Sequence, residues 1–423
     1  MNLLCVSNGH GEDTIAVRVL KELRQLPGAP SLAALPIVGE GVSFQRAGIA
    51  IAGPTRSMPS GGFIYMDKRQ VVRDLQGGLL GLTISQFKAL RQWAQAGGKI
   101  LAVGDVVPLA LAWASGAEYV FIGTAKSEYL VRDETGRLPN CPWLEGYAGS
   151  IYQPWECWLM GHARCQGVFV RDQITADYLQ KQQVPAQYAG NPMMDGLESS
   201  AAKLATLTAA FPSAEAVVTL VLLPGSRAPE AFENWQRILL ALDSVGANFP
   251  DRHLRLLAAI APALNLAVLK EALVEGGWQP EPGTYPTYSR QNLRLILTSD
   301  AFAECLHLAD AAIATAGTAT EQVVGLGKPA FTLPGPGPQF TYAFAEAQSR
   351  LLGASIILVP QPQQMGAALA TCLQDQARLQ RIALNGRQRM GQPGAARQIA
   401  LCLNQIYAAP ALGEWVKPGA GGS

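Results

Sequence analysis

The chain has 423 residues, of which 49% are hydrophobic and 15% are charged, and its formal net charge is +1. This hydrophobic content excludes a largely disordered chain, and the length predicts two domains of ordinary size. The near-neutral charge excludes the strongly basic surface that nucleic-acid-binding domains carry, so we expect no nucleic-acid partner.

Seven cysteines are scattered along the chain without a Cys-x-x-Cys pair. This pattern predicts buried thiols in a reducing compartment rather than a disulfide framework or a zinc site. The first residues lack the basic region and the cleavage site of a signal peptide. The longest apolar stretch, 106–117, contains Pro108 and is too short to cross a bilayer. We therefore expect a cytoplasmic protein, and the slightly positive mean hydropathy of +0.13 leaves peripheral contact with the inner membrane open.

An apolar run over 3–7 predicts the first strand, and the glycine-rich loop 8–13 leads from it into a helix over 14–26. Glycines flank His10 in this loop, so its ring is expected to be exposed. Because an imidazole titrates near neutral pH, His10 is a candidate for proton transfer. The alternative is a polar turn residue that caps the helix together with Asp13.

The segment 60–93 combines glycines, apolar side chains and the basic residues Lys68, Arg69 and Arg73. This mixture favours docking of a lipid at an anionic membrane surface, and the alternative is that these residues fill the core of the first domain. Farther along, the tryptophan-containing segment 155–160 could either form an apolar rim for the acceptor site or fill the core of the first domain. For its two tryptophans we favour the core.

Asp105 follows a strand predicted over 100–103. Its carboxylate can cap the helix that begins after it or take part in chemistry at the end of the strand, and the residues leave both roles open. The other strands predicted for the first half are 32–37, 119–122, 167–170 and 186–189.

The second half repeats this plan. An apolar run that begins at Val217 leads through a Pro-Gly-Ser-Arg loop into a helix over 229–242. Further strands are predicted over 254–259, 293–297, 311–314, 330–333 and 356–359. Because strands and helices alternate in both halves, we predict an α/β protein with two doubly wound sheets. The predicted division is an N-terminal domain over 1–195, a second domain over 196–385, and a helix in 386–423 that packs back on the first domain before a flexible tail.

The segment 313–321 carries the strongest signal in the chain. It predicts a buried strand, a turn of small residues from Gly317 to Thr320, and a helix start that carries Glu321. A ligand can approach the backbone of such a turn closely, and the N–H groups that open the helix suit a phosphate. Glu321 can accept hydrogen bonds from vicinal sugar hydroxyls. The segment therefore indicates a nucleotide-sugar diphosphate site, with an ordinary strand-to-helix junction capped by threonine as the alternative.

Three blocks, 189–195, 222–227 and 314–321, resemble in order and spacing the characteristic blocks of lipid A disaccharide synthase and related GT-B glycosyltransferases. The chain more closely resembles the lipid A disaccharide synthase-related group seen mainly in cyanobacteria. The resemblance implies a GT-B-like fold in which two Rossmann-like domains face a cleft. It also implies transfer of a hexosyl group from a UDP-sugar to an acceptor that is a lipid or a membrane-associated molecule.

The resemblance places the donor mainly on the second domain. Arg227 is suited to anchor the diphosphate, because a guanidinium can bind phosphate through two hydrogen bonds. Glu321 is expected on the ribose and Asn191 near the uracil, although a polar turn residue is the plainer account of Asn191. The full set implied for the donor is Asn191, Gly225, Ser226, Arg227, Gly317, Thr318, Ala319, Glu321, Gln339 and Thr341.

On the acceptor side, the resemblance implies that His10 or Asp105 is the base that takes the proton of the acceptor hydroxyl. The sequence after Asp105 lacks the Pro-Asp-Phe-Asn continuation of the family. The departing UDP is expected to be stabilised by Arg227 and by the first N–H groups of the helix after Gly317. The sequence holds no Asp-x-Asp pair and no metal-ligand spacing of histidines, so we expect neither a metal nor a cofactor.

Two other function classes stay open. A UDP-sugar 2-epimerase would share this architecture, but its active site calls for a cluster of acids and histidines, of which the chain offers few. A non-catalytic nucleotide-sugar-binding module is the second alternative, because the first-half motifs diverge from the family. The sequence makes no prediction of the oligomeric state.

Overall fold

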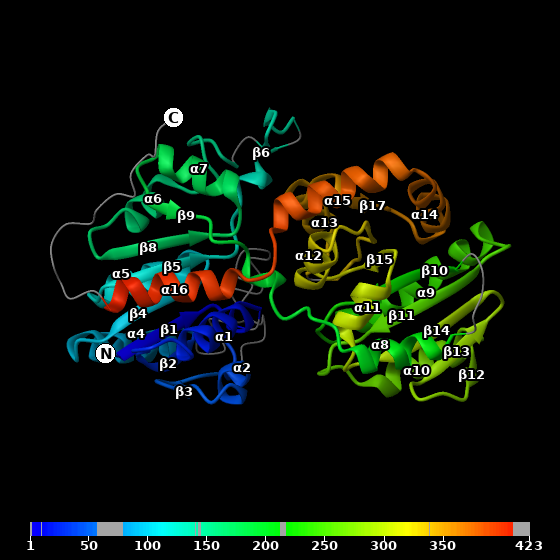
Figure 1. The fold of residues 1–423 in the computed structure, drawn as a ribbon, viewed down its shortest axis with the longest axis horizontal. Helices are drawn as coiled ribbons and strands as arrows, with labels where there is room; N and C mark the ends of the chain where they lie inside the picture. The colour runs from blue at the N-terminus through cyan, green and yellow to red at the C-terminus, as the bar shows by residue number, and fades with distance from the viewer. Residues whose placement is uncertain are drawn as a thin grey trace.

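The computed structural model describes residues 2–9, 11–56, 79–139, 141–142, 145–211, 217–337 and 339–408. These residues form two α/β lobes that lie side by side, as Figure 1 shows. Each lobe is built on one main β-sheet.

The N-terminal sheet has seven parallel strands in the order β3-β2-β1-β4-β5-β8-β9. Its strands are β1 (Asn2–Ser7), β2 (Ser31–Pro36), β3 (Ala50–Ile51), β4 (Lys99–Gly104), β5 (Tyr119–Gly123), β8 (Cys165–Val170) and β9 (Ala186–Gln187). The helices of this lobe are α1 (Gly11–Arg24), α2 (Val42–Arg46), α4 (Leu79–Gln95), α5 (Val106–Ser115), α6 (Pro154–Met160) and α7 (Gln173–Lys181). A separate hairpin joins β6 (Arg132–Asp133) and β7 (Gly136–Arg137).

The C-terminal sheet has eight strands in the order β12-β13-β14-β11-β10-β15-β16-β17. Its strands are β10 (Val217–Leu223), β11 (His253–Ala259), β12 (Gln279–Glu281), β13 (Thr287–Arg290), β14 (Leu293–Thr298), β15 (Ala311–Ala314), β16 (Ala330–Thr332) and β17 (Ile356–Leu358). The helices around it are α8 (Ala201–Ala209), α9 (Glu230–Asn248), α10 (Leu266–Glu275), α11 (Phe302–Leu308), α12 (Thr318–Gly325), α13 (Tyr342–Leu352), α14 (Met365–Gln374) and α15 (Gln376–Met390).

The central strands are apolar along their whole length because both faces of each sheet are covered. In β1, Leu3 and Cys5 belong to one buried cluster, whereas Leu4 and Val6 belong to another on the opposite face. Successive side chains of a strand point to opposite faces, so a continuous apolar run fills two cores at once. The strand β10 divides its side chains between two clusters in the same way.

The predicted fold class is confirmed, since two largely parallel sheets are present with helices packed around them. The hairpin of β12 and β13 was not predicted. It adds two antiparallel strands to the edge of the C-terminal sheet. Its first strand reads Gln-Pro-Glu, which lacks the apolar pattern that identifies a buried strand.

The last helix, α16 (Ala395–Ala408), returns to the N-terminal lobe and is drawn in red in Figure 1. Its buried side chains Ile399 and Leu403 join the core that α1 also fills. The hydroxyl of Tyr407 donates to the carbonyl of Ile100 in β4, over 3.3 Å. The chain therefore passes between the lobes twice, once after β9 and once between α15 and α16.

Three further features concern the helices, the cysteines and the metal-ligating side chains. Within the described part of the chain, no helix is long and apolar enough to cross a membrane. All seven cysteines are free thiols, and five of them are buried while Cys141 and Cys402 are partly exposed. The described residues contain no group of three or more metal-ligating side chains arranged around one point.

Candidate active site between the two lobes

The loops that follow β1 and β4 in the N-terminal lobe approach those that follow β10 and β15 in the C-terminal lobe. In parallel sheets, ligands bind at the carboxyl ends of the strands. A Cβ atom placed on Gly11, at the start of α1, would lie 3.7 Å from the Oγ1 atom of Thr318, at the start of α12. The two helices thus bring their first turns together, one from each lobe.

The loop after β1 needs glycine for its close approach to the segment that follows β2. Gly9 has φ of +123°, and a Cβ atom there would lie 2.5 Å from the carbonyl oxygen of Val38. A larger residue would be strained and would clash with the backbone. His10 lies outside the described residues, so its role as a base stays a prediction.

Asp105 and Asn8 form a reciprocal pair at the ends of β4 and β1. Asn8 Nδ2 donates to Asp105 Oδ1, and the backbone N–H of Asp105 donates to Asn8 Oδ1, both over 2.8 Å. The same Asp105 oxygen accepts from the N–H of Val107 and so caps α5. Gly104 leaves room for this pair, because a Cβ atom there would lie 1.8 Å from Asn8 Oδ1. The capping role of Asp105 is therefore present, while its role as a base stays a prediction.

Glu12 is a partly buried acid in the first turn of α1 that sequence reasoning did not select. The pKa of Glu12 is raised to about 7, mainly by burial and to a smaller extent by the nearby carboxylates of Asp105 and Asp13. Arg227, from the other lobe, acts in the opposite direction. Asp13 points inward and accepts a 2.5 Å hydrogen bond from Ser7. The only sequence signal for Glu12 was an acid within the glycine-rich loop 8–13.

The loop after β10 carries three residues of the predicted donor site. Gly225 has φ of +105° and packs beside the end of β15, since a Cβ atom there would lie 3.3 Å from the Thr315 carbonyl oxygen. Ser226 is exposed, whereas Arg227 is partly buried. Burial lowers the pKa of Arg227, and the carboxylates of Glu12 and Glu230 oppose that effect. Arg227 therefore faces an acid of the opposite lobe.

The turn before α12 ends in Gly317, which caps the helix without a side-chain hydrogen bond. The predicted alternative of a threonine cap is therefore not what the structure has. Gln348 Nε2 donates to the carbonyls of Ala316 and Gly317, over 3.1 and 3.4 Å. The first N–H groups of a helix have no partner within that helix. Those of Thr318 and Ala319 are therefore groups of the type that binds an anion.

Glu321 joins the lobes through an ion pair that the sequence did not reveal. Its Oε2 atom accepts from Arg171 Nη2 over 2.8 Å, and both side chains are nearly buried. Arg171 Nη1 also donates to the carbonyl of Thr124, over 3.1 Å. Burial lowers the pKa of Arg171, but Glu321 and Asp172 more than compensate, so it is raised overall. The expected contact of Glu321 with a ribose stays a prediction, and a sugar hydroxyl would have to share this carboxylate with Arg171.

Two more arginines of the C-terminal lobe contact the N-terminal lobe. Arg350 of α13 donates to Glu145 Oε2 over 2.7 Å and to the carbonyl of Leu130. The guanidinium of Arg389 in α15 lies 4.0 Å from the centre of the Tyr129 ring. These contacts join residues that are more than 200 positions apart in the sequence, so no local sequence pattern predicts them.

The loop before α13 is held by side chains of α9. Glu230 Oε1 accepts the backbone N–H groups of Gln339 and Phe340, over 3.1 and 2.6 Å. Arg237 Nη2 donates to the carbonyl of Pro334, over 2.6 Å. Thr341 caps α13 by accepting the N–H of Phe344. Contacts of Gln339 and Thr341 with a donor stay predictions.

Asn191 lies in the connection between the lobes and is buried. Its Oδ1 atom accepts the N–H of Met193, over 3.0 Å, as a turn residue does. Arg18 of α1 donates to the carbonyl of Pro192 over 2.8 Å, and Gln322 of α12 donates to that of Met193 over 2.9 Å. The connection is thus held from both lobes, and a contact of Asn191 with uracil stays a prediction.

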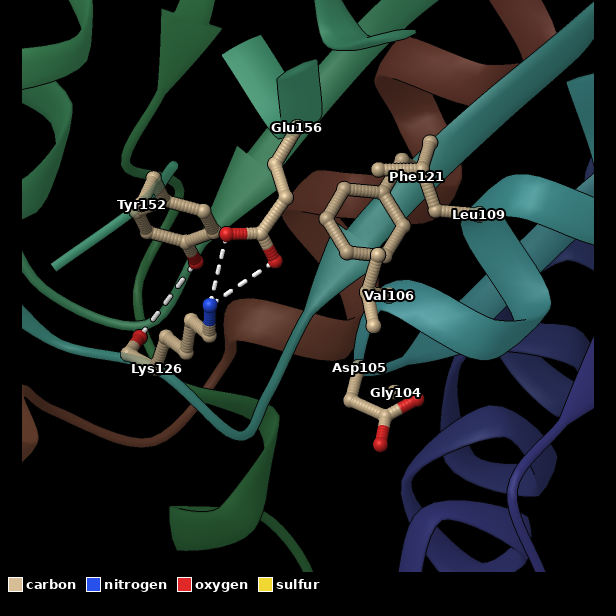
Figure 2. Close-up of a pocket in the computed structure, with 8 residues that line it drawn as sticks. All are labelled: Gly104, Asp105, Val106, Leu109, Phe121, Lys126, Tyr152 and Glu156. Carbon is tan, nitrogen blue, oxygen red and sulfur yellow. Dashed lines mark hydrogen bonds and ion pairs between the residues drawn. The ribbon is translucent and has the colours of Figure 1, made fainter. Parts of the chain in front are cut away.

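A cavity of about 10 Å³ lies beside Asp105. Figure 2 shows its ion pair, in which Lys126 Nζ lies 2.8 and 2.6 Å from the two carboxylate oxygens of Glu156. The Asp105 carboxylate points away from this pair. The cavity has room for about one water molecule, and Glu156 already neutralises Lys126. It is too small to hold a sugar.

A larger apolar groove, about 600 Å³ in volume, runs along α5 and α6. The prediction that its two tryptophans fill the core is wrong, because Trp155 and Trp158 are 52% and 57% exposed. The short helix α6 turns these two outward and buries Leu159 and Met160 instead. The predicted lipid-docking segment falls mainly on residues 57–78, which lie outside the described residues.

The comparisons with known proteins agree with this architecture. The family model for lipid-A-disaccharide synthetase matches residues 175–331. This stretch contains all three blocks on which the predicted resemblance rests, so that resemblance is confirmed there. The narrower likeness to a cyanobacterial group stays a prediction. Among the curated proteins, none matches the sequence.

Solved structures share the fold over nearly the whole chain. CalG4, the calicheamicin glycosyltransferase, aligns with a TM-score of 0.62 at 16% identity, covering 97% of this chain and 99% of its own. MurG from Acinetobacter baumannii aligns with a TM-score of 0.54 at 15% identity, covering 96% and 99%. The UDP-GlcNAc 2-epimerase from Neisseria meningitidis, solved with UDP-GlcNAc bound, has a TM-score of 0.55 at 15% identity, covering 96% and 100%. At these identities the likeness shows the GT-B fold. The family match over residues 175–331 and this fold together make the chain similar to lipid-A-disaccharide synthetase and to GT-B glycosyltransferases.

Proposed function

We propose that this enzyme transfers a sugar from a UDP-sugar to a lipid or membrane-associated acceptor without the help of a metal ion. The observation that carries the proposal is the meeting of two helix starts from opposite lobes, where Gly11 approaches Thr318. One side of this meeting point is rich in carboxylates, and the other offers a guanidinium and helix N–H groups. That combination suits proton removal on one side and a departing diphosphate on the other.

The donor half of the proposal rests on charge. As the bond between the sugar and the β-phosphate breaks, negative charge gathers on the departing UDP. Arg227 and the N–H groups that open α12 can stabilise this charge without a cation, because they are held in place before the reaction begins. Gly225 and Gly317 keep the backbone accessible to the phosphates.

The acceptor half rests on the apolar groove. Val106 lines both the cavity beside Asp105 and the groove along α5 and α6, so the groove begins next to the strand ends that carry the acids. Trp155 and Trp158 border it with exposed rings. Tryptophan is enriched where an apolar surface meets water at a membrane. This supports a lipid acceptor and peripheral contact with the inner membrane from the cytoplasmic side.

The proposal is tested with UDP-N-acetylglucosamine, because it is the ligand of a protein of the same fold. Calorimetry is expected to detect UDP binding. Release of UDP from this donor should require a bacterial membrane lipid extract and should be unchanged by excess EDTA. Absence of UDP binding would contradict the donor assignment, and loss of activity in EDTA would contradict metal independence.

An epimerase is the second candidate, because UDP-GlcNAc 2-epimerases share the fold over 96% of this chain. The same incubation separates the two. A transferase leaves a glycosylated lipid and free UDP, whereas an epimerase returns an isomerised UDP-sugar without needing lipid.

A further inference from the structure

Glu12 stands at the point where the two lobes meet, yet neither the family resemblance nor the donor site assigns it a role. It is the second residue of α1, next to Gly11, whose backbone faces Thr318 of α12. Its electrostatic neighbours come from three elements: Asp13 from α1 itself, Asp105 from the end of β4, and Arg227 from the loop after β10. Glu12 therefore lies between the predicted acceptor side and the predicted diphosphate anchor.

The three acids at this edge differ in what their oxygens already do. Asp13 accepts a hydrogen bond from Ser7, and Asp105 Oδ1 accepts from both Asn8 and Val107. Within the described part of the chain, no other residue donates a hydrogen bond to the Glu12 carboxylate; only its own backbone N–H does so. Of the three, Glu12 has the carboxylate that is least engaged in holding the fold.

We propose that Glu12 is the catalytic residue that accepts the proton of the acceptor hydroxyl. This inference rests on the proposed glycosyl transfer. In the step, the acceptor oxygen forms a bond to the anomeric carbon as its proton moves to a carboxylate oxygen of Glu12. The bond between the anomeric carbon and the β-phosphate oxygen breaks, and its electron pair leaves with UDP. Asp105 is then a positioning residue that holds the start of α5.

The pKa of Glu12 agrees with this role. A general base works best when its pKa lies near the working pH, and burial brings that of Glu12 to about 7. Because the ionised carboxylate is the active form, turnover should rise with pH through this pKa. The groups that set the midpoint are Asp13 and Asp105, which raise the pKa, and Arg227, which lowers it.

The test compares Glu12→Gln with Glu22→Gln, a change of the same chemistry on the same helix. Glu22 lies about 15 Å farther along α1 and makes only a partly exposed ion pair with Arg397. UDP release from UDP-N-acetylglucosamine with a bacterial membrane lipid extract is followed from pH 5.5 to 9. We expect Glu12→Gln to lower kcat by about 100-fold or more and to remove the rise of turnover with pH. Glu22→Gln should keep both.

Glu12→Asp is a second variant that keeps the inference testable if Glu12→Gln does not fold. It keeps an acid with a shorter reach and an ordinarily lower pKa, so the rise of turnover should persist at reduced kcat and move to lower pH. An unchanged kcat or an unchanged pH profile in Glu12→Gln would overturn the inference. Calorimetry with UDP separates this failure from failure of the proposed function. If the wild-type protein does not bind UDP, the donor site is contradicted. If the wild-type protein binds UDP and Glu12→Gln leaves kcat unchanged, only the assignment of Glu12 as the base is contradicted.

Discussion

The two strand edges that face each other in this enzyme carry opposite chemistry. The C-terminal edge presents Arg227 and the first N–H groups of α12, all with positive character. The N-terminal edge presents the carboxylates of Glu12 and Asp105. An anionic leaving group suits the first edge, and removal of a proton suits the second.

The two edges also differ in how they are held. On the C-terminal side, side chains of neighbouring helices fix the backbone, as Glu230 fixes the loop at 339–340 and Gln348 fixes the carbonyl groups before α12. On the N-terminal side, the site residues hold one another, as Asn8 holds Asp105. The comparison teaches that the backbone of the C-terminal edge is fixed by side chains of neighbouring helices, whereas Asn8 and Asp105 at the N-terminal edge hold each other.

Breaking the ion pair that connects the two edges should have the largest effect. Glu321→Ala leaves the guanidinium of Arg171 buried without its carboxylate, so we expect a loss of about 3 kcal/mol in the free energy of unfolding. Denaturant titration measures it. The double change Arg171→Met with Glu321→Leu should recover part of this loss, because it removes both buried charges. A loss below about 1 kcal/mol in Glu321→Ala would show that the lobes do not depend on this pair.

The positive edge is tested by Arg227→Ala. Hydrogen bonds to charged groups contribute about 1.5–3 kcal/mol, so UDP should bind roughly 10- to 100-fold more weakly. Calorimetry measures the Kd. Arg252→Ala, on the exposed surface of the same lobe, should leave it unchanged. If both variants bind UDP as the wild type does, Arg227 is not a diphosphate anchor.

The apolar groove beside the acidic edge is tested by Trp158→Ala. The ring packs edge-on against Trp113, with centroids 5.4 Å apart, and aromatic contacts of this kind are worth about 0.5–1.5 kcal/mol. We expect KM for a membrane lipid extract to rise by roughly 3- to 10-fold while the Kd for UDP stays the same. Tyr147→Ala, which removes another exposed aromatic ring of the lobe, serves as control. A rise in the Kd for UDP would point to a general disturbance instead.

The two roles weighed for Asp105 are separated by comparing alanine with asparagine. Asparagine caps a helix about as well as aspartate, so Asp105→Ala should lose about 1 kcal/mol of stability and Asp105→Asn almost none. If Asp105 positions rather than accepts the proton, Asp105→Asn lowers turnover much less than Glu12→Gln does. An equal or larger fall in Asp105→Asn would return the role of base to Asp105.

The smallest expected effect is the uptake of part of a proton when UDP binds near pH 7. The diphosphate brings negative charge toward Glu12 and engages Arg227, whose cation otherwise lowers the pKa of Glu12. The pKa therefore rises on binding, and a carboxylate that is partly ionised near its pKa of about 7 gains protons. Binding enthalpies measured in buffers of different ionisation enthalpy report this uptake. Glu12→Gln should abolish it, whereas release of protons would contradict the predicted placement of the diphosphate.

Much of the architecture followed from local patterns. Apolar runs such as those of β1 and β10 identified buried parallel strands, because only a strand covered on both faces tolerates them. The three family blocks predicted the resemblance to lipid A disaccharide synthase, and all of them fall within the matched stretch 175–331. The loop glycine at 225 fits its position because its φ of +105° is a conformation that residues with a side chain rarely adopt.

Only the tertiary structure decided which distant residues meet. Glu12 and Arg227 are 215 positions apart, and Arg171 and Glu321 are 150 apart, so both pairings depend on how the lobes pack. The exposure of Trp158 was likewise decided by the direction in which α6 packs on the lobe. The residue type alone does not distinguish an apolar side chain in the core from one on the rim of a groove. Sequence periodicity encodes the elements because it is local. The site lies between elements, and its electrostatics arise from contacts that form when the two lobes close on each other.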